Sequence, residues 1–158
     1  MTQQNNFLCV LRNLFHIKCK ERYNYIFLST DFGYHNASAL CEAAIYKKNP
    51  DVKVIHSDHT LRTFDIEYAS IILQRTKDLP NKSIVVAVVD PGVGTERQSV
   101  ILKVKSGLFF VGPNNGIFTD VANEFGVEAL YQIESKKVRE EWQIGTFDGR
   151  DLYAPAAF

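Results

Sequence analysis

The sequence predicts an α/β fold, a three-layer α/β/α sandwich around a largely parallel central sheet. Apolar, β-branched runs alternate with segments in which apolar residues recur every three or four positions, as strands and helices do in such folds. The run SIVVAVVD at residues 83–90 is typical of a parallel strand buried on both faces. With 158 residues, 46% of them hydrophobic and 23% charged, the chain suits one globular domain.

The first half of the chain predicts two strands and two helices. YIFLST at 25–30 is expected to form the first strand, and VKVIHS at 52–57 the second. Between them, residues 36–47 have helical periodicity, and Asn-Pro-Asp at 49–51 ends that helix. A second helical pattern opens at Phe64-Asp65.

The second half begins with the buried run and then predicts a strand pair, a helix and a last strand. Ser106-Gly107 lies between two β-rich segments and marks their turn, while Gly126 closes the helical pattern. The expected elements are strands at 99–105, 108–112 and 129–134 and a helix at 117–125. A further helix is expected to begin at Ala154.

Residues 1–24 differ from the rest and are interpreted as an N-terminal extension, either a short amphipathic helix or a floppy segment. A signal peptide has its positive charges before the apolar stretch, whereas here they follow it or interleave with it, so that interpretation is rejected. Residues 25–158 are expected to form the domain.

Composition and charge exclude several functional classes. Eighteen basic and eighteen acidic residues cancel, which argues against a nucleic-acid partner. No apolar run approaches the roughly 20 residues of a membrane span, so no membrane partner is expected. Cys9, Cys19 and Cys41 lack metal-ligand spacing and indicate reduced thiols in a cytoplasmic protein.

Three loops of unusual composition follow predicted strands: TDFGYHN at 30–36, DPGVGTER at 90–97 and GPNNG at 112–116. Ligands of open α/β sheets bind beyond the carboxyl ends of the strands, where these loops should lie. In the second loop, Pro91 and two glycines allow a sharp turn that can bring Arg97 back beside Asp90. Such a pair can orient a water molecule, or it can be a structural ion pair; the spacing does not decide between them.

The other polar residues also have two interpretations each. Asp31 can bind a ribose diol or cap a turn, and Asn115 can contact a polar ligand or make an Asn-Gly turn. In HSDH at 56–59, His56 and Asp58 share one face of an extended segment while His59 does not. A structural role is favoured there, and no metal is expected.

The motifs TDFG, FD at 64–65, VAVVDPGVGTER, GPNNGIFT and TFDGRDLYAPAAF occur in one order across residues 25–158. This set resembles the S-adenosylmethionine (SAM) hydroxide adenosyltransferase family, the relatives of the SAM-dependent fluorinating and chlorinating enzymes. The resemblance implies an α/β/α N-terminal domain, a C-terminal β-barrel domain, and trimers with active sites at subunit interfaces. It also implies substitution at the 5′ carbon of SAM by water, giving adenosine and L-methionine without metal or cofactor.

The resemblance also assigns roles to individual residues. Asp90 and Arg97 match the aspartate and arginine that organise the attacking water, and an acid at position 90 favours water over a halide. The remaining matches are to substrate-binding residues. They are Asp31 for the ribose, Phe64 for the adenosine, Ser38 for the methionine end, and Asn115 in the GPNNG motif.

The sequence departs from the family pattern at three places. Asp148 occupies the position of the family histidine, so it is either a substitute base held by Arg97 or a sign of impaired catalysis. Asn36 occupies a position that is usually acidic in the family, where the acidic residue binds the methionine amino group. The β-barrel domain is expected to be absent, which would leave Ala156, Ala157 and Phe158 without their usual partners. The alternatives are therefore a SAM hydrolase, as a homotrimer or with a separate C-terminal chain, and an inactive binding module or decayed fragment.

Overall fold

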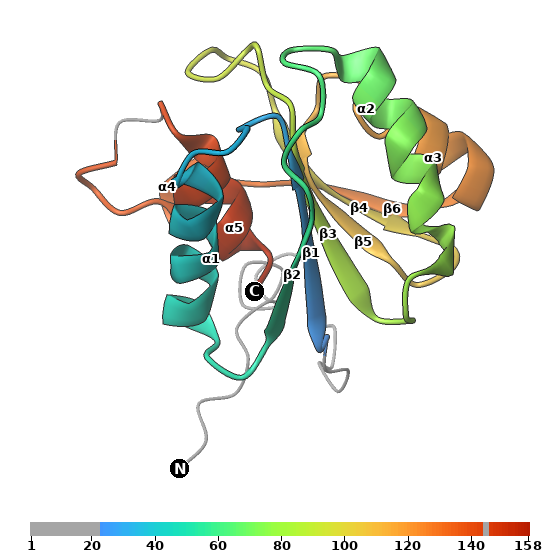
Figure 1. Ribbon diagram of the computed structural model, residues 1–158, viewed down its shortest axis with the longest axis horizontal. Coiled ribbons are helices and arrows are strands. Elements are labelled where there is room, and N and C mark those ends of the chain that lie inside the picture. The colour runs from blue at the N-terminus through green and yellow to red at the C-terminus, as the bar shows by residue number, and fades with distance from the viewer. Residues whose placement is uncertain (1–22, 144–145) are drawn as a thin grey trace.

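The computed structural model describes residues 23–143 and 146–158, so the predicted extension over residues 1–24 lies almost wholly outside the described residues. Six strands form one sheet with helices on both faces (Figure 1), which confirms the predicted α/β sandwich. The strands are β1 (Tyr25–Thr30), β2 (Lys53–Asp58), β3 (Ser83–Val88), β4 (Ser99–Val104), β5 (Phe109–Pro113) and β6 (Val127–Gln132). The main helices are α1 (Ala37–Lys48), α2 (Ile66–Leu73) and α3 (Thr119–Phe125).

The sheet has the order β2-β1-β3-β5-β4-β6. β1 pairs in parallel with β2 and β3, and β3 pairs in parallel with β5. β4 runs antiparallel to both β5 and β6, which confirms the predicted strand pair around Ser106-Gly107. The parallel half places the ends of β1, β3 and β5 at one edge, where the three unusual loops begin.

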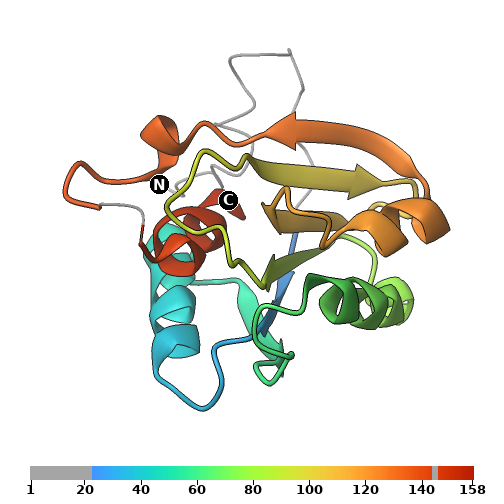
Figure 2. The same ribbon diagram turned by 90° about the horizontal axis from the view of Figure 1, so that it is seen from above.

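Alternate residues of the central strands face opposite layers of the sandwich. Ile84, Val86 and Val88 belong to the apolar cluster under α1, whereas Val85 and Ala87 belong to the cluster under α2 and α3. All six residues of β3 are buried, as the sequence predicts for a strand covered on both faces. Figures 1 and 2 show α1 with the C-terminal helices on one face and α2 with α3 on the other.

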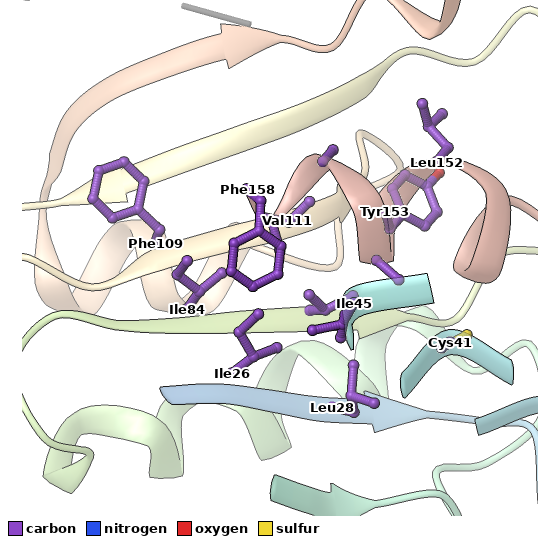
Figure 3. Close-up of a cluster of buried hydrophobic side chains, with 14 of the residues drawn as sticks. Ile26, Leu28, Cys41, Ile45, Ile84, Phe109, Val111, Leu152, Tyr153 and Phe158 are labelled. Carbon is purple, nitrogen blue, oxygen red and sulfur yellow. The ribbon is translucent and has the colours of Figure 1, made fainter. Parts of the chain in front are cut away.

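The C-terminal segment is helical from further upstream than predicted. α5 (Ala154–Ala156) begins at the predicted residue, but a wide π-type turn at Gly149–Tyr153 precedes it and continues directly into it. Ala156, Ala157 and Phe158 are buried within this chain, because they pack in the cluster under α1. Figure 3 shows Phe158 above the sheet with the other labelled members of that cluster.

Two short helices and one cap complete the structure. A 3-10 segment (Gln74–Asp78) extends α2. The short helix α4 (Ser135–Val138), which was not predicted from the sequence, follows β6. The predicted start of α2 is close to the observed one, because the Asp65 side chain accepts a hydrogen bond from the Tyr68 amide and caps the helix. Among the described residues, no helix is long and apolar enough to cross a membrane.

Candidate active site

The three unusual loops meet at the carboxyl edge of the sheet, as predicted. The amide of Asp31 donates a hydrogen bond to the Val88 carbonyl at 3.2 Å, which joins the loop after β1 to the end of β3. The side-chain amide of Asn115 donates to the Val89 carbonyl at 2.9 Å, which joins the loop after β5 to the same place. Residues from three distant parts of the sequence are thereby brought together.

Asp90 and Arg97 form a forked ion pair across the second loop. Gly94 adopts a positive φ of 81°, a conformation that favours glycine, as the chain turns back toward Asp90. Nε of Arg97 then donates to Oδ1 of Asp90 at 2.8 Å, and Nη2 donates to Oδ2. Both side chains are largely buried, so this pair is protected from solvent screening and fixes both groups rigidly.

Asp148 joins this pair although it lies 51 residues further along the chain. Nη2 of Arg97 donates to its Oδ2 at 2.6 Å. Only 3% of Asp148 is exposed, because it lies at the start of the π-type turn under α1. The structure therefore brings together the three residues proposed as catalytic from the sequence, with two carboxylates sharing one guanidinium.

Three further residues, which sequence reasoning missed, complete the cluster. The Tyr153 hydroxyl donates to Oδ2 of Asp90 at 3.2 Å and accepts from the Ser99 hydroxyl at 3.3 Å. Ser99 in turn accepts from Nη1 of Arg97 at 2.9 Å. Nη2 of Arg139 donates to Oδ1 of Asp148. Ser99 follows Arg97 by two residues in sequence, a weak local signal, whereas Tyr153 and Arg139 reach the cluster only through the tertiary fold.

The protonation states in this cluster follow from burial and charge. Burial raises the pKa of Tyr153, and the nearby Asp90 carboxylate adds to this effect, so the hydroxyl stays protonated and donates a hydrogen bond to Asp90. Burial alone would lower the pKa of Arg97, but hydrogen bonds to Asp90 and Asp148 raise it overall. Arg97 is therefore a permanent cation.

A polar hollow of about 280 Å³ opens beside this cluster. Arg97, Ser99, Arg139 and Asp148 line it, together with the backbone turn at Thr95. Such a hollow gives water access to the buried charged groups from the side of β4 and α4.

Asp31, which follows β1, and Phe64, which precedes α2, also lie together at the carboxyl edge of the sheet. The amide of Phe64 donates to Oδ2 of Asp31 at 3.0 Å. Phe64 has a positive φ of 60°, which is unusual for a residue with a bulky side chain, and its side chain stays 62% exposed. Burial raises the pKa of Asp31, the hydrogen bond from the Phe64 amide opposes this rise, and the Asp90 charge adds a smaller increase.

The remaining predicted binding residues lie on α1 and after β5. Asn36 precedes α1 and is exposed, with no capping hydrogen bond from its side chain, and Ser38 lies in the first turn. Asn115 uses both halves of its amide within the protein, donating to Val89 and accepting from the Ile117 amide at 3.2 Å. Its contacts in the structure are therefore those of a loop-ordering residue.

The histidines of HSDH pair with each other. Nε2 of His59 and Nδ1 of His56 are 2.6 Å apart, and the outer ring nitrogens contact Thr30 and Glu42. Within the described residues, no group of three His, Cys, Asp or Glu side chains could hold a metal ion. These contacts are structural, linking β1 and β2 to α1.

A sequence model of the SAM hydroxide adenosyltransferase N-terminal domain matches residues 26–158. The chain belongs to this family. The match begins at β1 and extends through all three unusual loops and the Asp148 segment.

Members of the family with curated names include two relevant relatives. The (R)-S-adenosyl-L-methionine hydrolase of Methanocaldococcus jannaschii is 38% identical over 134 residues, which cover 82% of this chain and 50% of that protein. A fluorinase of Nocardia brasiliensis is 26% identical, over 73% of this chain and 46% of the enzyme. A crystal structure of an uncharacterized conserved protein from Thermotoga maritima aligns with a TM-score of 0.78 and 36% identity, covering 84% of this chain and 52% of that one. The chain thus spans about half the length of the relatives it matches.

Proposed function

We propose that this chain supplies the water-activating half of a SAM hydrolase, which forms adenosine and L-methionine. The observation that most supports this proposal is the buried, two-pronged ion pair between Asp90 and Arg97 at the carboxyl edge of the sheet. Hydrogen bonds to Ser99 and Tyr153 hold this pair in place. Family membership and the names of the hydrolase relatives support the substrate. An acid at position 90 disfavours a halide nucleophile, because a carboxylate repels an anion.

In the proposed reaction, a water oxygen forms a bond to C5′ of SAM while the C5′–S bond breaks. The electron pair of that bond stays on sulfur, so the sulfonium becomes the neutral thioether of methionine and needs no general acid. One proton leaves the water. Oδ2 of Asp90 already accepts hydrogen bonds from Arg97 and Tyr153, whereas Oδ1 accepts one from the described residues, so Oδ1 is the oxygen that orients the water and takes the proton.

The substrate-binding roles are part of the same proposal. The Asp31 carboxylate accepts hydrogen bonds from the ribose hydroxyls, and the exposed ring of Phe64 packs on the adenosine. Ser38 and Asn36 lie near the methionine end, at the beginning of α1. Asn115 orders the loop after β5 and so acts through the backbone around Val89.

The assembly is also a proposal. Because the chain spans about half of its relatives, we propose that a homotrimer or a separate C-terminal chain completes the pocket. We further propose that residues 25–158 act as the N-terminal domain in the cytoplasm, with SAM as a substrate and no cofactor.

One observation favours a second function, binding of adenosine or SAM without turnover. Both oxygens of Asp148 accept hydrogen bonds from arginines, so this residue is poorly placed to act as the base that replaces the family histidine. A chain with only part of the water-activating set could bind the nucleoside and leave it unchanged.

An incubation with SAM and a calorimetric titration with adenosine together separate the two functions. Purified protein is mixed with SAM, and adenosine is measured by chromatography beside an Arg97→Ala variant. Adenosine formed by the unaltered protein alone supports the hydrolase. Calorimetric binding of adenosine without any product supports the binding module, and equal amounts of adenosine in both samples contradict a role for Arg97.

A further inference from the structure

Asp148 is held between two guanidinium groups from different parts of the chain. Its Oδ2 accepts from Arg97 and its Oδ1 accepts from Arg139, and the carboxylate is almost completely buried. Arg139 directly follows α4, where its amide donates to the Ser135 carbonyl at 2.9 Å. The short helix α4 therefore fixes the position from which Arg139 reaches Asp148.

The charges of the cluster balance only when Arg139 is included. Asp90 and Asp148 carry two negative charges in a buried site, and Arg97 supplies one positive charge for both. Arg139 supplies the second, at the carboxylate oxygen of Asp148 that Arg97 does not contact. A buried carboxylate without its partner is strongly unfavourable, so loss of Arg139 would make Asp148 compete with Asp90 for Arg97.

The two carboxylates would compete for a single nitrogen atom of Arg97. Nη2 of Arg97 donates to both Oδ2 of Asp90 and Oδ2 of Asp148. If Asp148 draws this nitrogen toward itself, the forked contact with Asp90 opens and the Asp90 carboxylate turns. Small displacements of a group that orients a nucleophile cost large factors in rate.

We propose that Arg139 is a positioning residue of the active site. Its guanidinium neutralises the buried carboxylate of Asp148, so that Arg97 keeps both of its hydrogen bonds to Asp90. The inference rests on the proposed hydrolase function. Within the described residues, the buried Nε of Arg139 has no hydrogen-bond partner, so the side chain is not held there by a network of its own. Its ion pair with Asp148 is the contact that accounts for its place.

The test compares Arg139→Leu, Arg139→Lys and the control Lys136→Leu in adenosine-forming assays. Lys136 lies on the same short helix and is exposed, so its replacement removes an equal charge without touching the cluster. We expect Arg139→Leu to lower kcat at least about tenfold, with KM changed less than about threefold. Arg139→Lys should recover part of the loss, and Lys136→Leu should stay within about twofold. Equal kcat for the two leucine variants, or a change in KM alone, overturns the proposal.

The route through Asp148 is tested with Asp148→Asn as a background. A neutral amide does not compete for Arg97, so adding Arg139→Leu to Asp148→Asn should change kcat by less than about twofold. The same fold loss in both backgrounds means that Arg139 does not act through Asp148, and the proposal fails.

Failure of the proposed function gives a different pattern. If the unaltered protein forms no adenosine, the hydrolase assignment fails, while the pairing of Arg139 with Asp148 is still judged by thermal unfolding, which needs no substrate. Arg139→Leu should lower Tm, and Asp148→Asn should remove most of that difference. Additive Tm shifts overturn the inference, whatever the activity.

Discussion

Replacing Arg97 by methionine tests how strongly the buried cluster holds the fold together. The change keeps an unbranched side chain of similar length and removes the guanidinium. It breaks the fork on Asp90 and the contacts with Asp148 and Ser99. It therefore leaves two buried carboxylates with fewer partners.

The expected loss of stability depends on the hydrogen-bond partners that Asp90 and Asp148 each keep in Arg97→Met. Breaking a buried ion pair costs about 3–5 kcal/mol when one charge is left uncompensated. Asp148 keeps Arg139, and Asp90 keeps the Tyr153 hydroxyl, so we expect the lower end, about 3 kcal/mol. For a chain of 158 residues this corresponds to a fall in Tm of about 6–12 °C.

The assay is reversible thermal unfolding followed by far-UV circular dichroism. Arg62→Met is the matched control, because Arg62 pairs with Asp65 on the surface and is mostly exposed. That control should lower the free energy of unfolding by less than about 0.5 kcal/mol. Asp90→Asn in the Arg97→Met background should restore part of the loss, since an amide carries no charge. Equal Tm values for the two methionine variants would refute the reasoning.

Three further predictions concern other parts of the fold. Gly112→Ala should destabilise the protein by about 3 kcal/mol or prevent folding, because a Cβ there would clash with the Ala87 carbonyl oxygen. Gly107→Ala should cost less when both are compared by urea unfolding, because a Cβ there meets open space and only the positive φ of Gly107 opposes it. Burial and the neighbouring His56 lower the pKa of His59 below its ordinary value of 6.5, although Asp58 opposes this. Below about pH 6.5 the unfolded chain therefore binds more protons at His59 than the folded chain does. The stability that His59 contributes should be constant above about pH 6.5 and fall as the pH drops through the folded pKa. His59→Gln should reduce the difference in Tm between about pH 7.5 and about pH 5.5, and an unchanged difference would contradict this. Burial raises the pKa of Cys41 to about 12, so its thiol should not react with iodoacetamide at neutral pH while the protein is folded. Peptide mass spectra should show Cys41 modified only after unfolding, and rapid labelling of Cys41 in the folded protein would contradict this prediction.

The strand framework could be predicted because its signals are local. The run at β3 is apolar throughout since both of its faces are covered, and Asp90 with Arg97 lies in one glycine-containing loop whose geometry is set by neighbouring residues. Sequence spacing was therefore sufficient to predict their contact.

The C-terminal segment could not be predicted in the same way. GRDLY looks polar and unsuited to a buried helix, yet Asp151 is buried because Arg150 and Gln143 satisfy its carboxylate. The π-type turn also precedes Pro155, which favours a helix start at Ala154 when only local rules are applied. The contact of Arg139 with Asp148 depends on α4, a four-residue helix too short for a periodic signal.

In the proposed reaction, water attacks C5′ of SAM beside Asp90 and Arg97. The most direct measurement is incubation of the protein with SAM in oxygen-18 water, followed by mass spectrometry of both products. If water attacks C5′, adenosine should carry one oxygen-18 and methionine none, and Arg97→Ala should form no labelled adenosine. Unlabelled adenosine, or no adenosine at all from the unaltered protein, would contradict it.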